Sequence, residues 1–447
     1  MDIILNRVQE IIWGPWTAAL VVGAGVYFTC RSRGYQVRRL PRWWKATAGS
    51  MFSGKPAGGI SQFQASTAVL AGTLGTGNIV GVATALTLGG PGAVFWMWVA
   101  AFFGMMISYC ENYLGILYRK REGKHWLGGP MRYMEVGLKS KWLAGLFAAC
   151  CALCAFGVGN LTQINSIAHA AESAFSAPRW STGLFVALLA APAILGGVNR
   201  VVKLTEKLVP FITIAYVLAC LVVVGMHITA LPGAFARIIR EAFSAPAVAG
   251  GAMGAMLVGV RRGVFTNEAG MGSTVLVHAA ADYDSPEEAG MWGIFEVFVD
   301  TLMMCTLTAL AILTSGALGK TDGGGAPLDG AALAAEAFRP ALGDASGAFM
   351  TVAALLFAFA TIVAWSCFGG AAFSYISGGR YLLVYKLLYV GAIMLGAVTG
   401  LRTVWTVSDI LNGLMLIPNL LAVILLSGRV FGKRPPDRCA GDKNVFT

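Results

Sequence analysis

Small and polar residues gather at positions 72–82, in the middle of a long apolar stretch. The segment reads Gly-Thr-Leu-Gly-Thr-Gly-Asn-Ile-Val-Gly-Val, where a continuous membrane helix would favour leucine or alanine. Because each glycine costs a helix about 0.8–1 kcal/mol relative to alanine, the segment predicts a helix break. Broken membrane helices expose carbonyl oxygens that bind cations and N–H groups that bind anions, as in secondary transporters. The alternative interpretation is that the glycines only allow neighbouring helices to pack closely.

The composition predicts that this segment lies in a membrane. Of the 447 residues, 57% are hydrophobic and 12% are charged, whereas charged residues make up about 25% of ordinary soluble domains. The apolar blocks recur along the whole chain and do not alternate with polar residues, so helices are predicted rather than an outer-membrane barrel. The sequence contains neither a G-x-S-x-G nor an H-E-x-x-H motif, and an enzyme is not expected.

The apolar blocks predict an all-α integral membrane protein with about eleven transmembrane helices. Lysine and arginine cluster in the short connections between spans, and the positive-inside rule places these connections in the cytoplasm. The net charge of +11 therefore indicates topology and not binding of nucleic acid. The N-terminus is predicted outside, and the basic tail, residues 429–447, in the cytoplasm. The polar segment 263–273 is also expected outside the spans, in the cytoplasm, and an external loop is expected at 317–345.

A second glycine-rich span is predicted at residues 246–262, five spans after the first. It contains Gly250, Gly251, Gly254 and Gly259. Two weak helices at corresponding positions are typical of transporters built from inverted repeats. We therefore predict one extra helix at 10–30, a first repeat at about 59–230 and a second repeat at about 245–428, with five helices in each repeat. In this arrangement the two broken helices meet at the middle of the membrane.

Polar side chains in the fourth span are candidates for the same site. Asn160, Gln163 and Ser166 recur at three-residue intervals, so they share one face of a regular helix. They either bond neighbouring helices together or face a cavity, where an amide could bind a carboxylate or an ammonium group. Both interpretations stay open at this point.

Two pairs of residues in later spans are separated by one helical turn. Thr361 and Trp365 share a face of the ninth span. A lone tryptophan often serves packing or anchors a helix at the membrane interface, but Trp365 lies deep in its span, which weakens the anchor interpretation. Glu296 and Asp300 share a face of the eighth span. Because carboxylates inside a membrane are functional candidates by default, this pair either couples transport to an ion or makes a structural hydrogen bond.

Four longer segments also stand out, and they resemble the alanine or glycine:cation symporter family, also called sodium:alanine symporters. The similarity extends over nearly the whole chain. The resemblance implies a LeuT-type fold with ten core helices and one extra helix at the N-terminus. The segments are Gly59-Ile-Ser-Gln-Phe-Gln64, Gly75-Thr-Gly-Asn78-Ile-Val-Gly-Val-Ala-Thr84-Ala, Gly89-Gly-Pro-Gly-Ala-Val-Phe-Trp-Met-Trp98 and Thr266-Asn-Glu-Ala-Gly-Met-Gly-Ser273.

The resemblance also implies a function, namely a symporter of the bacterial inner membrane that takes up small neutral amino acids, chiefly alanine and glycine. Sodium is the implied co-transported ion, and the amino acid and the lipid bilayer are the implied partners. The sequence does not indicate an oligomeric state. One alternative is a proton-coupled symporter that uses Asp300 or Glu296. Another is a channel-like or receptor-like membrane protein whose glycines serve only packing.

A similar Gly-x-Gly-Asn motif lies in the first core helix of the bacterial leucine transporter, and this resemblance implies a sodium site. The ion is expected to bind two backbone carbonyl groups at the end of the first half-helix and two hydroxyl groups of the ninth span. The implied sodium ligands are Ala71, Leu74, Thr361 and Ser366.

The same resemblance implies a substrate site next to the ion. N–H groups at the helix break are expected to bind the substrate carboxylate. Gln163 is expected to face the break, and Trp365 is expected to limit the side-chain pocket to about a methyl group, because overpacking costs about 1–3 kcal/mol. The implied substrate-binding residues are Thr73, Gly75, Thr76, Gly77, Asn78, Gln163 and Trp365.

Overall fold

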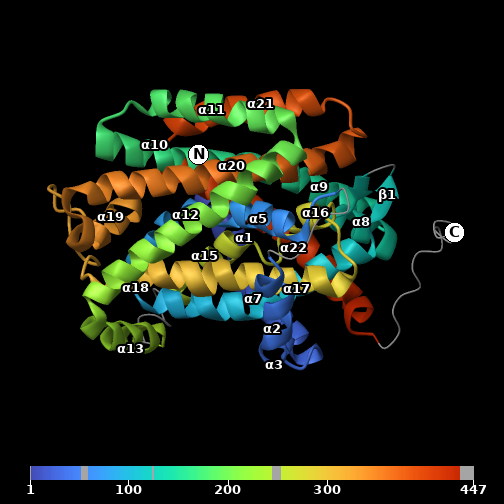
Figure 1. Cartoon of the computed structure of the whole chain (residues 1–447), viewed down its shortest axis with the longest axis horizontal. Coiled ribbons are helices and arrows are strands. Elements are labelled where there is room, and N and C mark those ends of the chain that lie inside the picture. Colours follow the sequence, from blue (N-terminus) through green and yellow to red (C-terminus); the bar gives the residue numbers. More distant parts are fainter. Residues whose placement is uncertain (1, 52–58, 123–124, 244–252, 433–447) are drawn as a thin grey trace.

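The computed structural model describes residues 2–51, 59–122, 125–243 and 253–432. Helices make up most of the described chain, as the sequence predicts (Figure 1). The start of the predicted second repeat, including Gly250 and Gly251, lies outside the described residues, and so do residues 433–447 of the predicted tail.

The first part of the chain contains the extra helix and the first broken helix. The extra helix α2 begins at Pro15, because proline favours the first position of a helix. The elements are α1 (Asp2–Ile12), α2 (Pro15–Arg31), α3 (Tyr35–Arg38), α4 (Leu40–Ala46), η1 (Ala48–Ser50), α5 (Gln62–Thr73), η2 (Thr76–Asn78), α6 (Val80–Gly89), α7 (Gly92–Leu117), β1 (Lys120–Glu122), β2 (His125–Leu127), α8 (Pro130–Arg132), η3 (Tyr133–Gly137), α9 (Lys141–Phe156), η4 (Gly157–Leu161), α10 (Thr162–Phe175), α11 (Arg179–Gly196), α12 (Val198–Met226), η5 (Ile228–Ala230) and α13 (Leu231–Ala242).

The second part contains the second broken helix and ends in a long helix. Its last helix, α22, continues through residues 429–431, which the sequence analysis assigns to the tail. The elements are η6 (Met253–Leu257), α15 (Val258–Asn267), α16 (Val275–His278), α17 (Pro286–Val297), η7 (Phe298–Cys305), α18 (Thr306–Thr314), α19 (Gly330–Leu342), η8 (Gly343–Ala345), α20 (Ser346–Ser377), α21 (Leu382–Val398) and α22 (Leu401–Phe431). The elements η3, η4, η6 and η7 are π-helical, and η1, η2, η5 and η8 are 3-10 turns.

Local side-chain chemistry determines where two of the central helices begin. The Ser61 hydroxyl accepts the Gln64 N–H at 3.1 Å, and Gln64 Oε1 accepts the Ser61 N–H at 3.0 Å. This reciprocal pair is a capping box, and it starts α5. Ser285 starts α17 in a similar way, because its hydroxyl accepts the Glu288 N–H at 3.3 Å.

Helix pairs on both sides enclose the helices that carry the polar residues. α11 packs against α21 along one edge of the bundle, and α7 packs against α17 and α15 nearer the opposite edge (Figure 1). α5 lies between these pairs, where it contacts α12, α20 and α17. The first broken helix therefore lies in the interior of the bundle.

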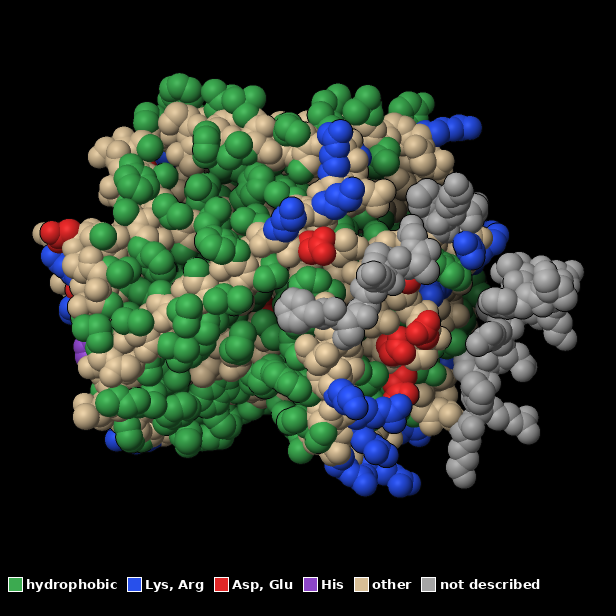
Figure 2. All heavy atoms as spheres, viewed as in Figure 1, with side chains coloured by type: hydrophobic (Ala, Val, Ile, Leu, Met, Phe, Trp, Pro, Cys, Tyr) green, Lys and Arg blue, Asp and Glu red, His purple; other side chains and the backbone are tan. Residues whose placement is uncertain are grey.

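The outer surface of the bundle is apolar. α11, α12 and α21 expose large hydrophobic side chains, including Leu188, Phe211 and Leu388, which are 67%, 68% and 62% exposed. Figure 2 shows hydrophobic side chains over most of one face, with Lys and Arg side chains gathered at the end where α3 lies. Eight helices of the described chain are long and apolar enough to span a membrane. The chain is therefore a multi-pass membrane protein, while the count of about eleven spans stays a prediction.

The sequence analysis misses two elements that lie between the long helices. β1 and β2 form a short antiparallel hairpin. The external loop expected at 317–345 contains α19, whose first N–H, on Gly330, donates to Asp329 Oδ1 at 2.6 Å. α19 forms because its sequence is rich in alanine, the strongest helix former, and because Leu333 and Phe338 are buried against the bundle.

Candidate functional site

The first break separates α5 from α6 at residues 74–79. Gly75 has an extended backbone, with φ −115° and ψ −157°, and the 3-10 turn η2 follows it. A β-carbon at Gly75 would lie 2.9 Å from both Gln163 Oε1 and Thr361 Oγ1. Glycine is required here because two other helices approach the backbone so closely. The break predicted from the glycine cluster is therefore confirmed.

Side chains bind the N–H groups of this break. The Gly75 N–H donates to Asn78 Oδ1 at 3.1 Å, and the Thr76 N–H donates to Gln163 Oε1 at 3.0 Å. The Thr76 hydroxyl donates to the same Gln163 oxygen, also at 3.0 Å. Asn78 and Gln163 are buried. The structure thus brings four of the predicted substrate-binding residues together as two adjacent hydrogen-bonded pairs.

The carbonyl groups at the end of α5 face α20. The Thr361 hydroxyl lies 2.9 Å from the Ala71 carbonyl oxygen and 3.0 Å from the Phe357 carbonyl oxygen, so it donates to this pair. Leu74 is buried at the end of the same helix. The buried Thr73 hydroxyl has no hydrogen-bond partner among the described residues. Because an unpaired buried hydroxyl costs free energy, Thr73 is suited to bind a polar ligand atom.

Ser366 lies apart from this group. Its hydroxyl donates to the Val363 carbonyl oxygen of its own helix at 2.6 Å. Thr361 and Ser366 are five residues apart, which places them about 140° apart around α20. The structure brings Ala71 and Thr361 together, whereas no hydrogen bond within the described chain joins Ser366 to either of them.

A second break separates α15 from α16 at residues 268–274. Glu268, Gly270 and Gly272 have φ values of +56°, +94° and +72°, in the left-handed region where right-handed helices end. Glu268 is 1% exposed, and Ser273 is fully buried. The expectation that residues 263–273 lie outside the spans is therefore wrong. Other helices supply hydrogen-bond partners for this polar segment, so it does not need water.

The two breaks approach each other in the interior of the bundle. A β-carbon at Gly77 would lie 3.0 Å from the methyl carbon of Thr266, near the end of α15. Asn78 Nδ2 donates to Asp300 Oδ1 at 2.8 Å. The Thr301 hydroxyl donates to Asp300 Oδ2 at 2.7 Å and lies 3.3 Å from the Thr266 hydroxyl. This network joins the first break, η7 and the second broken helix.

Trp365 connects α20 to the second break. Its indole N–H donates to Glu268 Oε1 at 3.0 Å, and the Ser273 hydroxyl donates to the other oxygen of the same carboxylate. The base of the Trp365 side chain lies so close to Gly159 of η4 that a β-carbon at Gly159 would overlap it. Sequence reasoning missed Glu268. The sequence signal that could have identified it is an acidic residue followed by Ala-Gly-Met-Gly, in a short polar segment between two apolar ones.

The polar residues of the fourth span have different contacts. Asn160 Nδ2 donates to the Tyr389 carbonyl oxygen on α21 at 2.7 Å, so Asn160 bonds two helices together. The Ser166 hydroxyl donates within its own helix at 2.9 Å. Gln163 instead reaches the first break. The π-helical turn η4 rotates these residues relative to a regular helix, so three-residue spacing does not keep them on one face.

Glu296 and Asp300 belong to different clusters. Glu296 Oε2 lies 3.0 Å from His278 Nε2, and His278 Nδ1 lies 2.6 Å from the Tyr283 hydroxyl. Asp300 binds Asn78. The π-helix η7 begins between the two carboxylates, and its wider turn directs them to different neighbours.

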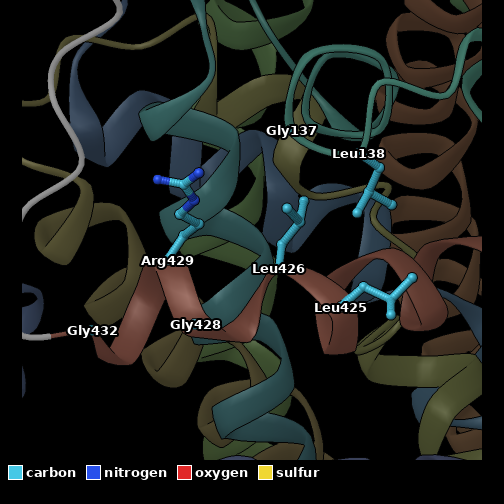
Figure 3. A pocket seen from close by; sticks show the side chains of 7 residues that line it. All are labelled: Gly137, Leu138, Leu425, Leu426, Gly428, Arg429 and Gly432. Carbon is cyan, nitrogen blue, oxygen red and sulfur yellow. The ribbon is translucent and has the colours of Figure 1, made fainter.

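A surface pocket lies away from the two breaks. Figure 3 shows that the C-terminal part of α22 and the end of η3 line it, with Leu138, Leu426 and Arg429 among its side chains. It contains none of the predicted substrate or sodium residues. The candidate site is instead the buried region between the two breaks.

The fold and the paired breaks define the class of protein. The solved structure of MhsT in complex with L-phenylalanine is similar to this chain, with a TM-score of 0.56 and 15% sequence identity. The similarity covers 84% of this chain and 90% of that one. It shows the LeuT-type fold that the sequence resemblance implies. Two facing broken helices in this fold are typical of secondary transporters.

Comparison of sequences identifies the family. The model of the "Sodium:alanine symporter family" matches residues 1–434. The chain is 40% identical over 433 residues to the sodium/alanine symporter AgcS of Methanococcus maripaludis, covering 96% of this chain and 95% of AgcS. It is 35% identical over 429 residues to the amino-acid carrier protein AlsT of Bacillus subtilis, covering 95% and 89%. The chain therefore belongs to the sodium:alanine symporter family and is a membrane transporter.

Proposed function

We propose that this transporter imports alanine or glycine together with sodium. The amino acid and the ion bind between the two broken helices. The two repeats, at about 59–230 and 245–428, move relative to each other and open the site to one side of the membrane at a time. The protein lies in the bacterial inner membrane, with its N-terminus outside and its C-terminus in the cytoplasm.

The observation that supports this proposal most directly is the set of N–H groups at the first break. Gly75 and Thr76 donate their N–H groups to side-chain oxygens of Asn78 and Gln163. A substrate carboxylate offers acceptor oxygens of the same kind. The N-terminus of α6 follows directly, and the N-terminal end of a helix favours negative charge. Gly77 lets Thr266 of the second broken helix approach this turn closely, because it has no side chain.

The sodium ion binds at the C-terminal end of α5. Carbonyl oxygens at a helix C-terminus carry partial negative charge, and half-helices in transporters bind sodium in this way. Ala71 and Leu74 provide two carbonyl ligands. The third ligand is the Thr361 hydroxyl oxygen, which lies 2.9 Å from the Ala71 carbonyl oxygen. Ser366 is the fourth ligand in this proposal, provided that its hydroxyl rotates away from Val363.

The preference for a small side chain comes from Trp365. This residue is fully buried and packs against Gly159, so its ring has little room to move. A substrate with a larger side chain would overpack the site, which costs about 1–3 kcal/mol. The Thr73 hydroxyl, which has no hydrogen-bond partner among the described residues, adds a polar contact for the small substrate.

The test is uptake of radiolabelled alanine into liposomes that contain the purified full-length protein. We expect saturable uptake that depends on an inward sodium gradient and is competed by glycine. Uptake that is unchanged when potassium replaces sodium would contradict sodium coupling. Uptake that does not saturate would favour a channel-like protein instead.

Proton coupling is the second candidate, because Asp300 is a fully buried carboxylate that binds Asn78. A buried carboxylate that takes up and releases a proton can couple transport to a pH gradient. Alanine uptake driven by an inward pH gradient without sodium would favour this mechanism, and Asp300→Asn would then abolish uptake. Glu296 contacts His278 and not Asn78, so the geometry favours Asp300 for this role.

A further inference from the structure

Glu268 is a buried carboxylate at the start of the second break. It directly follows the last residue of α15, and it is 1% exposed. Its φ of +56° lies in the left-handed region, which residues other than glycine, asparagine and aspartate seldom adopt. The protein therefore holds an acidic side chain at a position where a glycine would be easier to accommodate.

The carboxylate of Glu268 is bound by two neutral donors, the indole of Trp365 and the hydroxyl of Ser273. Two other buried carboxylates have basic partners. Asp409 Oδ2 lies 3.8 Å from Arg261 Nε, and Asp409 Oδ1 lies 3.9 Å from Arg262 Nη1. Glu296 Oε1 lies 2.9 Å from His278 Nε2.

In the part of the chain that the structure describes, Glu268 forms no ion pair with a Lys, Arg or His side chain. The charged residues that interact with it electrostatically are Asp300 and Glu111, two further carboxylates. Among the buried carboxylates of the described chain, Glu268 thus resembles Glu111 and Asp300, which are also bound by neutral donors, and differs from Asp409 and Glu296, which have basic partners.

A carboxylate in this environment can bind a cation. Its two oxygens offer about four acceptor positions, and Trp365 and Ser273 use two of them. A buried negative charge without a counter-ion is unstable, so such a group takes up either a proton or a cation. Glu268 therefore combines free acceptor positions with a need for positive charge.

The contact with Trp365 indicates which cation binds. Trp365 lies one helical turn from Thr361, which contacts the end of α5, and in the proposed function it borders the pocket for the substrate side chain. The ammonium group and the side chain of an α-amino acid are attached to the same carbon. A residue that binds the ammonium group must therefore adjoin the wall of the side-chain pocket. Glu268 does so, because it accepts the Trp365 indole N–H at 3.0 Å.

We infer that Glu268 binds the ammonium group of the transported amino acid. The inference rests on the proposed amino-acid transport, and it adds the residue that distinguishes amino acids from carboxylates without an ammonium group. The N–H groups of Gly75 and Thr76 bind the substrate carboxylate at the first break. Each break then binds one of the two charges of the zwitterion.

The first experiment measures equilibrium binding of radiolabelled alanine to the purified full-length protein at saturating sodium. Glu268→Gln keeps the size of the side chain and removes its charge, so alanine binding is expected to weaken by at least about 100-fold. The matched control is Glu296→Gln, which changes a buried glutamate that contacts His278. The control is expected to bind alanine within about threefold of the unmodified protein. Thermal unfolding of both variants checks that they fold.

A second experiment uses the unmodified protein and does not depend on the folding of a variant. Lactate and propionate retain the carboxylate and the carbon chain of alanine, but they lack the ammonium group. When added at a concentration of about 100 times the Kd of alanine, neither compound is expected to displace labelled alanine. Displacement by lactate at the same concentration as unlabelled alanine would overturn the inference.

The variants distinguish the remaining outcomes. If Glu268→Gln binds alanine as tightly as the unmodified protein, the inference is wrong while the proposed function stands. If only the sodium affinity changes, Glu268 binds the ion, and the inference is also wrong. If the unmodified protein binds no alanine in sodium, the proposed function fails and the inference fails with it.

Discussion

The first break, at residues 74–79, is made by glycine and lined by amide groups, whereas the second, at residues 268–274, begins with a buried carboxylate. Gly75 and Thr76 present N–H donors that bind the side chains of Asn78 and Gln163. Glu268 presents acceptor oxygens. The first break thus offers hydrogen-bond donors, which suit the anion of the proposed function, and the second offers acceptors, which suit the cation of the inference above.

The two breaks share contacts with α20 but are otherwise held by different helices. Residues of α10, α20 and η7 contact the first break. Residues of α7 and α22 contact the second break. The Gly270 N–H donates to Glu111 Oε2 on α7 at 3.2 Å, and Asn419 Nδ2 on α22 donates to the Gly270 carbonyl oxygen at 2.8 Å. Substitutions at each break are therefore expected to alter different properties of the transporter.

The largest effect is expected for Asn78→Ala, which tests the anion-binding character of the first break. The substitution removes the side chain that links the Gly75 N–H to the Asp300 carboxylate, so the turn that presents the substrate-binding N–H groups loses the contacts that shape it. Hydrogen bonds to charged groups contribute about 1.5–3 kcal/mol each, so alanine binding is expected to weaken by more than about 100-fold. The control is Asn165→Ala, which removes a side chain that donates to the Gly396 carbonyl at 2.9 Å.

Equilibrium binding of alanine in saturating sodium measures this effect, and thermal unfolding shows whether each variant is folded. Near-normal binding by a folded Asn78→Ala variant would show that the substrate carboxylate binds elsewhere. The proposed contrast between the two breaks would then have no support from the first break.

The second-largest effect is expected for Trp365→Leu, which changes the side chain that connects α20 to the second break. A smaller side chain enlarges the pocket and removes the indole donor to Glu268. Valine and leucine should become substrates, and alanine binding should weaken by about tenfold, as expected when a pocket gains the volume of a few methylene groups. Competition against labelled alanine measures both changes. Trp43→Leu alters another buried tryptophan outside the breaks and should leave selectivity unchanged. Unchanged selectivity in Trp365→Leu would remove this residue from the pocket.

A more specific effect is expected for Thr361→Val, which keeps the shape of the side chain and removes the hydroxyl next to Ala71. Loss of one ligand oxygen should raise the sodium concentration needed for half-maximal alanine binding by about tenfold, which corresponds to about 1.4 kcal/mol. The control on the same helix is Thr351→Val, whose hydroxyl lies 2.9 Å from the Gly347 carbonyl. An equal sodium requirement in both variants would argue against a sodium site at the end of α5.

The smallest effect is expected for Ser366→Ala. The Ser366 hydroxyl donates within its own helix, so its removal should change the sodium requirement by less than about twofold unless the side chain rotates on binding. Sodium titrations of alanine binding measure the difference. A tenfold increase would show that Ser366 does rotate and bind the ion, as the family resemblance implies.

The two breaks also differ in how well the sequence alone predicts them. The glycine cluster predicts the first break correctly, because loss of the β-carbon weakens a helix wherever it occurs. The second break was placed too early, because a broken helix was predicted at residues 246–262 while the polar segment 263–273 was expected in the cytoplasm; the described part of that span, residues 253–267, is helical, and the break follows it. Its polar groups are instead bound by Trp365, Glu111 and Asn419, which lie far away in the sequence. Such partners become neighbours only after the helices pack.

The same limit applies to residues that were expected to share a helix face. Regular helix spacing groups Gln163 with Asn160, and Asp300 with Glu296. The π-helices η4 and η7 change that spacing, so only Gln163 and Asp300 reach the first break.

The sequence by itself determined that this is a helical membrane protein, that its helix breaks near Gly75, and which family it resembles. These properties depend on composition, on local backbone preference and on long motifs. Only the tertiary structure decided that Glu268 is buried beside Trp365 and that Ser366 points into its own helix. The direction of a side chain and the neutralisation of its charge depend on neighbours that other helices bring to it.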